Sequence, residues 1–303
     1  MNRAVLAADL GGTKIAAARV EQSGRITDRL VSATPSEGGL AVVDVLTHLL
    51  RRLPAKGVCA LGVDVPGLAG SDGNVWAPNI PGWERMPLGR TLARRFRLPV
   101  LVESDRNAFV TGEAWLGSAR HRRDVVFVTI GTGIGAGIIS GGRLIRGHAE
   151  LAGCLGWMAT RGRYLPEYRA VGCLETHAAG PGIALAAKRV FGRTMDTREV
   201  VAFARRGNRR AREVIREAGR DLGRALANVV DLLNPEMIIV GGGAAAAGNL
   251  LLDPAREELK RWAQPLAARQ MRIRRSRLGW RVGLLGIARL CFDRFQTEKG
   301  EPQ

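Results

Sequence analysis

The fold is decided by AVLAADLGGTKIAAARV, residues 4–20. Two short apolar segments flank a turn that holds the small and charged residues, namely Asp9, Gly11, Gly12, Thr13 and Lys14. Glycines let backbone N–H groups approach an anion closely, as oriented amides do in anion-binding nests. Asp9 is a candidate to hold Mg2+ through water, because Mg2+ prefers carboxylates and keeps much of its hydration. The stretch predicts a phosphate-holding β-hairpin, although an ordinary hairpin with a glycine turn would have the same pattern.

The bulk properties are those of a globular protein of one large domain or two ordinary ones. The chain has 303 residues, of which 46% are hydrophobic, and no apolar run approaches the roughly 20 residues that span a bilayer. Asp9 and Lys14 interrupt the apolar stretch at the N-terminus, so we expect no signal peptide and a cytoplasmic protein. The four cysteines lack metal-ligand spacing and are expected to be reduced thiols.

The net charge of +18 comes almost entirely from arginine. A nucleic-acid partner, a GC-rich genome and a solvated basic surface would each explain it. The arginines are spread over several predicted helices without interleaved aromatic residues, and the densest group lies in residues 269–281. This pattern favours a solvated basic surface over a nucleic-acid interface.

A second glycine-rich turn indicates an internal repeat. A predicted strand at 125–130 runs into the glycine-rich segment 131–137, which includes Gly131, Thr132 and Gly133, and a second strand begins at 138–139. This order echoes residues 5–20. We therefore expect a duplicated α/β architecture with one phosphate turn in each half.

A third glycine-rich turn follows the strongest helix pattern of the chain. Apolar residues recur at helical spacing over 208–233, and a buried strand at 237–240 then opens into Gly241, Gly242 and Gly243. A glycine triplet after a strand lets a ligand lie close to the backbone, so it is a nucleotide-binding candidate. The other expected helices are 41–53, 88–96, 107–115 and 283–295, and the other expected strands are 59–65 and 100–102.

Five motifs in one order resemble the ROK family of repressors and sugar kinases, most closely its glucokinase-like branch. They are DLGGTK at 9–14, APNIPGW at 77–83, ESDRN at 103–107, IGTGIG at 130–135 and GCLE at 172–175. The resemblance implies an actin-like, ribonuclease-H-like fold with two α/β domains flanking a nucleotide and sugar cleft. Residues 1–118 and a C-terminal helix at about 283–297 would form the smaller domain, residues 119–282 the larger one, and 298–303 a flexible tail.

The same resemblance implies roles for individual residues. Asp105 would be the base that takes the proton from the sugar hydroxyl, a role that phosphoryl transfer needs, although it could also merely cap the helix at 107–115. ATP and Mg2+ would be held by Asp9, Gly11, Gly12, Thr13, Lys14, Gly131, Thr132, Gly133, Gly241, Gly242 and Gly243. The sugar would be held by Asn79, Ser104, Asp105, Cys154, Trp157 and Glu175.

The chain departs from the family pattern on the sugar side. Cys154 stands where the family has a sugar-binding glutamate, Trp157 where it has a histidine that ligates zinc, and Ser104 where it has an asparagine. Of the family's zinc-binding cysteines only Cys173 remains, so we predict no structural zinc, because one thiol cannot supply a tetrahedral site. Cysteine is a poor hydrogen-bond partner and tryptophan offers one donor and a flat apolar face. We therefore expect a modified hexose or a cyclitol as substrate.

The leading prediction is an ATP-dependent sugar kinase that phosphorylates a hexose, with the 6-hydroxyl as the family default. The arginine-rich composition fits a GC-rich bacterium. An amino sugar from an antibiotic pathway, such as kanosamine, is therefore one candidate substrate. The alternatives are a non-catalytic sugar or nucleotide sensor and a DNA-associated regulator. Only eight residues precede Asp9, so we expect no helix-turn-helix domain before it. The family often forms dimers, but the sequence leaves the oligomeric state open.

Overall fold

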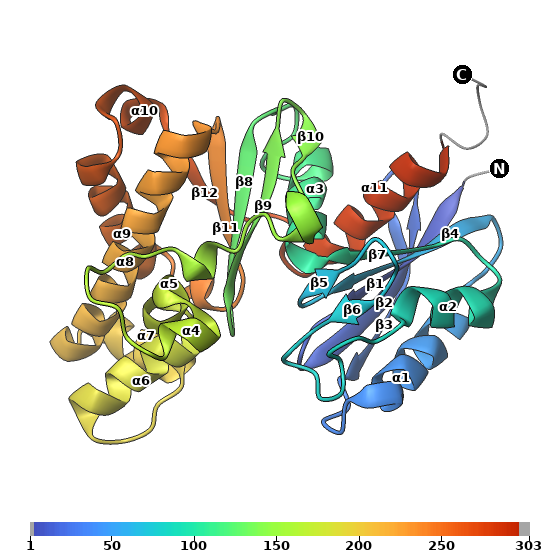
Figure 1. Ribbon diagram of the computed structural model, residues 1–303, viewed down its shortest axis with the longest axis horizontal. Helices are drawn as coiled ribbons and strands as arrows, with labels where there is room; N and C mark the ends of the chain where they lie inside the picture. The colour runs from blue at the N-terminus through green and yellow to red at the C-terminus, as the bar shows by residue number, and fades with distance from the viewer. Residues whose placement is uncertain (1–2, 297–303) are drawn as a thin grey trace. The chain divides into compact units, whose positions relative to one another are not determined.

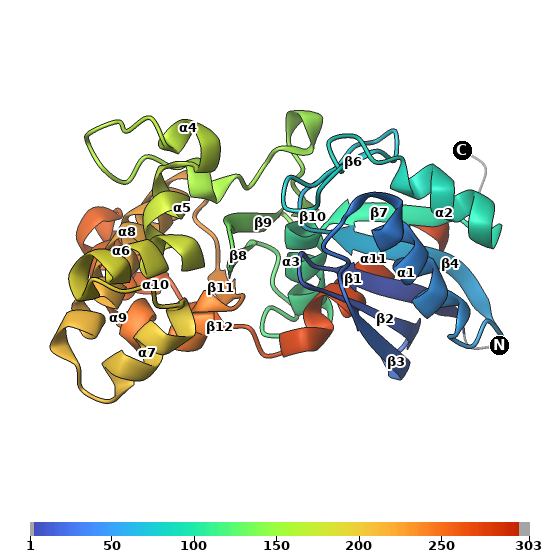
Figure 2. The same ribbon diagram turned by 90° about the horizontal axis from the view of Figure 1, so that it is seen from below.

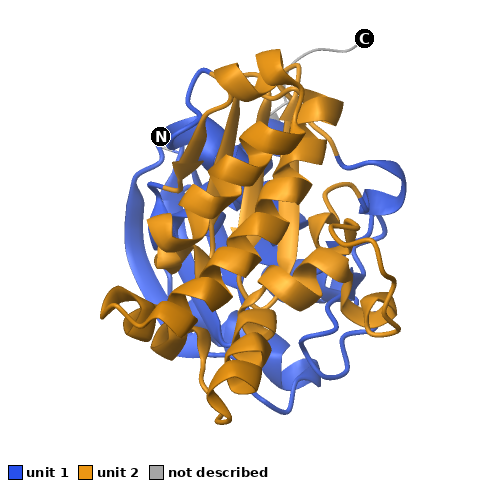
Figure 3. Cartoon of the chain, turned by 90° about the vertical axis from the view of Figure 1, so that its left-hand side faces the viewer, with its two compact units in different colours: residues 1–121, 146–151, 277–303 blue, residues 122–145, 152–276 orange. Residues whose placement is uncertain are grey.

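The computed structural model describes residues 3–296, and they form two compact units. Unit 1 contains residues 3–121, 146–151 and 277–296, and unit 2 contains residues 122–145 and 152–276 (Figure 3). The expected division at 118 and 283 lies near two of these boundaries. It leaves out segment 146–151, which joins unit 1 because Arg146 pairs with the buried carboxylate of Glu103. The expected tail at 298–303 lies outside the described residues.

Unit 1 is built on a five-stranded sheet with the order β3-β2-β1-β4-β7 (Figure 1). Strand β1 pairs antiparallel with β2 and parallel with β4, and β4 pairs parallel with β7. The strands are β1 (Ala4–Leu10), β2 (Lys14–Glu21), β3 (Ile26–Ala33), β4 (Val58–Val65) and β7 (Val100–Ser104). Strands β1, β4 and β7 end at the same edge, so residues at their carboxyl ends are neighbours.

Helices lie on both faces of the unit 1 sheet (Figure 2). Helices α1 (Gly39–Arg51) and α2 (Leu88–Phe96) pack with alternate strand residues such as Leu61 and Val63 into one apolar core. Helices α3 (Asp105–Leu116) and α11 (Val282–Gln296) pack closely against each other, and α11 covers the face that carries Gly62. A methyl group at Gly62 would lie 2.6 Å from the Cys291 sulfur of α11. The intervening residues of β1 and β4 therefore face α11.

Unit 2 repeats the plan of unit 1. Its sheet has the order β10-β9-β8-β11-β12, with an antiparallel β8–β9 hairpin and parallel β8–β11 and β11–β12 pairs. The strands are β8 (Val125–Ile130), β9 (Ile134–Ser140), β10 (Arg143–Leu144), β11 (Met237–Gly241) and β12 (Ile273–Arg275). The duplicated α/β architecture predicted from the two hairpins is confirmed. The predicted turn over 131–137 is wrong beyond residue 133, because Gly135 and Gly137 lie inside β9.

The helices of unit 2 bury one shared core, which is dominated by α8 (Arg209–Leu233) and α9 (Asn249–Trp262). Helix α8 matches the predicted segment, with the Asn208 side chain accepting from the backbone N–H of Ala211 as its N-cap. Gly219 and Gly223 of α8 let α9 approach closely, because a methyl group at either would lie 2.5 Å from an α9 carbonyl oxygen. The remaining helices are α4 (Tyr168–Val171), α5 (Cys173–Ala178), α6 (Gly180–Phe191), α7 (Thr197–Arg205) and α10 (Pro265–Gln270).

Short elements complete the described part of the chain. They are the strands β5 (Leu68–Ala69) and β6 (Val75–Trp76) and the 3-10 turns η1 (His148–Glu150), η2 (Leu155–Trp157), η3 (Ala244–Ala247) and η4 (Gly279–Arg281). No helix among residues 3–296 is long and apolar enough to cross a lipid bilayer. Part of the arginine-rich segment 269–281 forms β12 at the edge of the unit 2 sheet, with Arg274 and Arg275 exposed. Exposed charge on an edge strand discourages pairing with other chains.

Candidate functional site

The β1–β2 hairpin has the turn that the sequence predicts. The Gly11 N–H donates to the Lys14 carbonyl at 2.9 Å, and the Thr34 hydroxyl donates to the Gly11 carbonyl at 2.7 Å. Gly12, Thr13 and Lys14 are exposed, so their backbone is open to a ligand. A methyl group at Gly12 would lie 4.0 Å from Cβ of Asn79. The structure therefore brings Asn79, a predicted sugar-side residue, next to the predicted phosphate turn.

Two carboxylates lie side by side at the end of β1 and β4, because Asp9 and Asp64 are register partners in these parallel strands. The Asp64 side chain is fully buried, and neither of its oxygens has a hydrogen-bond partner among residues 3–296. Burial and the neighbouring Asp9 carboxylate raise the pKa of Asp64 well above its usual value, and burial also raises the pKa of Asp9. Unsatisfied carboxylate oxygens of this kind fit a hard cation such as Mg2+.

Sequence reasoning missed Asp64, although a signal was present. It is the single charged residue in the expected strand 59–65, and it stands at the carboxyl end of that strand, as Asp9 does in its own.

Asp105 is the first residue of α3, and Ser104 occupies the N-cap position without a side-chain capping bond. The Asp105 Oδ1 accepts from the backbone N–H of Arg106 at 2.7 Å. The Asp105 side chain is partly exposed at the surface, but protein atoms surround most of it. This burial raises the pKa of Asp105 to about 7, and the Asp9 charge adds to the shift. A carboxyl group with this pKa is suited to accept a proton at neutral pH.

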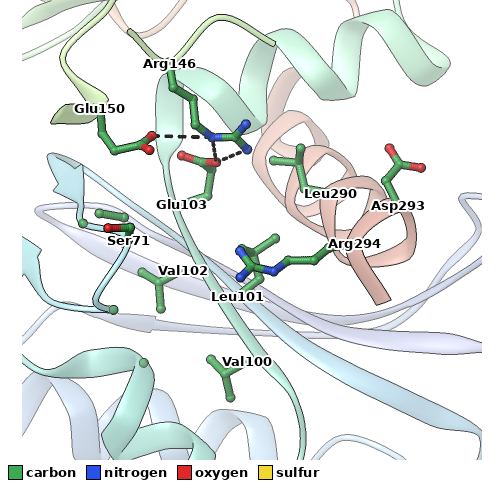
Figure 4. Close-up of a pocket in the computed structure, with 14 residues that line it drawn as sticks. Ser71, Val100, Leu101, Val102, Glu103, Arg146, Glu150, Leu290, Asp293 and Arg294 are labelled. Atoms are coloured by element: carbon green, nitrogen blue, oxygen red, sulfur yellow. Dashed lines mark hydrogen bonds and ion pairs between the residues drawn. The ribbon is translucent and has the colours of Figure 1, made fainter. Parts of the chain in front are cut away.

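An ion pair between the buried Glu103 and the partly exposed Arg146 fixes the segment that carries Asp105 (Figure 4). Glu103, 4% exposed, accepts from Arg146 at 3.1 Å (Nε) and 2.7 Å (Nη2). Its other oxygen accepts from the Ser104 backbone N–H and the Asn107 side-chain amide, both at 2.9 Å. The residues before and after Asp105 are thus tied to one carboxylate. Sequence reasoning missed Arg146 because it lies 43 residues from Glu103, at a spacing with no pattern.

A cavity of about 600 Å³ lies beside this ion pair in unit 1 (Figure 4). Its lining includes Val100, Leu101 and Val102 of the edge strand β7 together with Glu103 and Arg146. None of the predicted site residues lines it. We therefore describe it as a feature separate from the predicted phosphate and sugar positions.

In unit 2, Glu175 joins the second glycine turn to the sugar-side segment. Its Oε2 accepts from the Ile134 backbone N–H at 2.6 Å, immediately after the turn at Gly133. A methyl group at Gly133 or at Gly156 would lie 2.8 Å from this same oxygen. The structure thus places Glu175 between the predicted phosphate turn and the segment that contains Cys154 and Trp157. Burial raises the pKa of Glu175.

Cys154 is the N-cap of the short turn η2 and Trp157 is its last residue, 49% exposed. The loop that follows is held by pairs between side chains. Arg161 donates to the fully buried Asp221 carboxylate at 3.1 and 2.6 Å, and the Tyr168 hydroxyl lies 2.7 Å from His177 Nε2.

Among residues 3–296, no group of three or more histidine, cysteine, aspartate or glutamate side chains is placed to hold a metal ion. The absence of a structural zinc stays a prediction.

The third glycine turn lies against the second. Strand β11 ends at Gly241, and Gly242 has φ of +89°, a left-handed conformation that favours glycine. A methyl group there would also lie 2.5 Å from the Ile130 carbonyl, just before Gly131, whereas nothing lies within 4 Å of one at Gly243. The predicted residues therefore form two groups. Unit 1 holds Asp9, Gly11, Gly12, Thr13, Lys14, Asn79, Ser104 and Asp105, and unit 2 holds the rest.

Comparisons with known proteins agree with the motifs. The sequence model of the ROK family matches residues 5–294. The chain is 32% identical to a glucokinase of Streptomyces coelicolor, with 93% of this chain and 96% of the relative covered. It is 29% identical to an N-acetyl-D-glucosamine kinase of Citrobacter koseri, with 92% and 96% covered.

A solved structure agrees as well. The crystal structure of a ROK family glucokinase from Streptomyces griseus in complex with glucose and AMPPNP is similar with a TM-score of 0.80 at 31% identity, over 95% of this chain and 98% of that chain. The match extends over nearly the whole sequence and over both sheets, so the chain belongs to the ROK family and has its actin-like fold.

Proposed function

We propose that the protein is an ATP-dependent sugar kinase, which transfers the γ-phosphoryl group of ATP to a hydroxyl of a hexose. The observation that carries this proposal is the Asp105 carboxyl at the start of α3, with a pKa of about 7 in the same unit as the Asp9 hairpin. A general base is most effective when its pKa is near the working pH. Glucokinases and an N-acetyl-D-glucosamine kinase among the relatives support the class of reaction.

In the proposed mechanism, Asp105 accepts the proton of the attacking sugar hydroxyl, which we take to be the 6-hydroxyl. The exposed backbone of Gly12 and Thr13 binds phosphate oxygens, as does the turn at Gly131–Gly133. Lys14 supplies a positive charge at the first of these turns. Bound Mg2+, held by Asp9 and by water, would neutralise negative charge on the phosphates. The Glu103–Arg146 pair keeps the Asp105 backbone in place during the transfer.

On the sugar side, the hydroxyl of Ser104 is buried and has no hydrogen-bond partner among residues 3–296, so a sugar hydroxyl would satisfy it. Cys154 accepts hydrogen bonds poorly, and the exposed indole of Trp157 offers an apolar face. We propose that the protein accepts a hexose changed at one ring hydroxyl, for which an amino sugar such as kanosamine is a candidate. A site that lacks a hydrogen-bond acceptor no longer selects for the sugar hydroxyl that this acceptor would bind.

The test is a coupled assay of ADP release with ATP, Mg2+ and a panel of sugars. The panel contains glucose, mannose, N-acetylmannosamine, N-acetylglucosamine, 3-amino-3-deoxyglucose and cyclitols, and the Asp105→Asn variant is the control. We expect sugar-dependent turnover that disappears in the variant. Glucose as clearly the best substrate would contradict the modified-hexose proposal, and sugar binding without turnover would contradict the kinase in favour of a sensor.

A further inference from the structure

A basic cavity lies between α1 and α2 in unit 1. The two helices lie side by side on one face of the sheet and share its apolar core (Figures 1 and 2). The cavity has a volume of about 420 Å³, within the range of roughly 300–1,000 Å³ that is typical of small-molecule sites. Its lining residues are Asp44, Thr47, His48, Arg51, Arg52 and Arg95. None of the residues predicted for the kinase site lines this cavity, and the proposed mechanism uses none of its side chains.

Arg95 reaches from α2 to α1 and is held there by two acceptors. Its Nη1 donates to Asp44 Oδ1 at 2.7 Å and to the hydroxyl of the buried Thr47 at 2.9 Å. The Thr47 hydroxyl donates in turn to the Val43 carbonyl at 2.7 Å. The Nε and Nη2 of Arg95 have no hydrogen-bond partner among residues 3–296. The guanidinium is therefore fixed with donors to spare, and a fixed planar guanidinium loses little freedom when it binds an anion.

The other basic side chains of the cavity are not paired with carboxylates. Within the described part of the chain, Arg52 and His48 make no side-chain hydrogen bond or ion pair. The Arg51 guanidinium lies over the Phe96 ring, 6.0 Å from its centroid. Three arginines and one carboxylate leave an excess of two positive charges in the lining when His48 is neutral. The net charge of +18 on the whole chain adds to the attraction for anions.

A phosphate group matches this charge and these donors. A guanidinium presents parallel N–H groups that fit two oxygens of one phosphate. A phosphate monoester is close to a dianion at neutral pH, because its second pKa is about 6. It would balance both excess charges, whereas a carboxylate or chloride ion would leave one of them unbalanced. The Asp44 carboxylate opposes anion binding, but Arg95 already balances its charge.

We propose that the cavity between α1 and α2 binds the dianion of a phosphomonoester or of inorganic phosphate, at a site separate from the nucleotide. Arg95 is its fixed donor, and Arg51 and Arg52 supply the remaining charge. A sugar phosphate, the class of product that the proposed kinase would release, carries such a dianion. The proposal does not depend on the kinase function, because the two sites have no residue in common.

The experiment is nuclear magnetic resonance of the full-length protein with 13C-labelled histidine rings. The protein is titrated with inorganic phosphate and, separately, with glucose 6-phosphate, at constant pH and ionic strength. The chain has four histidines, and His48→Gln identifies the signal of the ring in the cavity. The variants Arg95→Gln and Arg52→Gln each remove one charge, and Lys14→Ala alters the predicted nucleotide turn. Arg198→Gln, at an exposed arginine of α7, is the matched control.

We expect the His48 signal to move along a saturable curve in the wild type, Lys14→Ala and Arg198→Gln. Affinity should fall by about tenfold in Arg95→Gln and in Arg52→Gln, as expected for loss of a hydrogen bond to a charged group. Thermal unfolding shows whether each variant is folded. The Arg52 side chain has no partner in the described chain, so Arg52→Gln keeps the proposal testable if Arg95→Gln does not fold.

Asp44→Asn provides a test of opposite sign. Asparagine keeps an oxygen acceptor for Arg95 and removes the negative charge from the cavity. Phosphate affinity should therefore rise, by about threefold for a charge at an exposed position. Equal or weaker affinity in folded Asp44→Asn would overturn the proposal.

Three other results would also overturn it. They are a His48 signal that does not move with either ligand, an equal loss of affinity in Arg52→Gln and Arg198→Gln, and loss of the response in Lys14→Ala, which would place the phosphate at the nucleotide turn. Tighter binding of glucose 6-phosphate than of inorganic phosphate would support a sugar phosphate as the ligand, and equal binding would support free phosphate. Failure of sugar-dependent ADP release would refute the kinase and leave this site standing.

Discussion

Replacing Asp105 with asparagine is expected to raise the free energy of unfolding above pH 7 while it lowers sugar-dependent activity strongly. The pKa of Asp105 is raised from 3.8 to about 7, mainly by burial. A folded-state pKa above the unfolded-state value means that the folded protein binds the proton more tightly. Protonated Asp105 therefore makes its full contribution to the stability of the folded protein below pH 3.8, and this contribution is lost as the pH rises through 7.

The size of the effect follows from the shift. Each pKa unit corresponds to about 1.4 kcal/mol, which sets an upper value of about 4 kcal/mol for Asp105. Because the side chain is partly exposed, we expect about half of this in the measured free energy of unfolding. Asparagine does not ionise, so the Asp105→Asn variant should lack this loss and be about 2 kcal/mol more stable than the wild type at pH 8.

The assay is urea unfolding of both proteins between pH 5 and 8.5 in a chelator, with Asp253→Asn as the control at an exposed site. The difference in free energy between Asp105→Asn and the wild type should grow with pH and level off above 7. Sugar-dependent ADP release by the variant should fall by about 100-fold or more, as expected for loss of a general base. A pH dependence of unfolding that is parallel in the two proteins would refute the reasoning about Asp105.

Three further predictions concern packing and ions. Arg146→Ala should lower the free energy of unfolding by about 2 kcal/mol, because Glu103 stays buried without its cation. In urea unfolding, the loss caused by Arg146→Ala should be smaller when Glu103→Gln is also present. An unchanged loss in the double variant would argue against the ion pair. Gly62→Ala should lower the free energy of unfolding by about 1–3 kcal/mol through overpacking against Cys291. The control Gly162→Ala should have little effect, because a methyl group there has nothing within 4 Å. Equal losses in the two variants would be inconsistent with the contact at Gly62. Incubation with a zinc chelator should leave the melting temperature unchanged if the loop before Cys173 needs no zinc, and a drop in melting temperature on chelation would contradict this.

Local patterns made much of the fold predictable. The hairpins at 4–21 and 125–140 each combine apolar strands with a glycine turn, and their repetition led to the duplicated α/β architecture that the structure confirms. Strand β3 (Ile26–Ala33) escaped prediction because its charged residues lie on an edge strand, where polar side chains reach solvent. Helices α5 to α7 also escaped, because their apolar residues contribute to a core shared with distant segments.

The candidate site was predictable where its chemistry lies within single motifs. Gly11–Lys14 and Gly131–Gly133 form the turns expected of them, and Asp105 begins α3. The supporting contacts were not predictable. Glu175 reaches Ile134 across 41 residues and Arg161 reaches Asp221 across 60. Such pairs depend on how distant elements pack together, and neither composition nor spacing carries that information.

The route of the chain between the two units has a consequence for synthesis and folding. Unit 1 includes α11, whose residues 282–296 pack near Gly62 in β4 and against α3. A growing chain therefore lacks part of unit 1 until nearly all of unit 2 has been made. Residues 3–121 alone would expose the apolar sheet face that α11 covers, and such surfaces promote aggregation. Contacts this far apart in sequence also predict slow folding. Expression of residues 3–121 as a fragment should give insoluble protein, and a fusion that also supplies segments 146–151 and 277–296 should give a soluble unit 1.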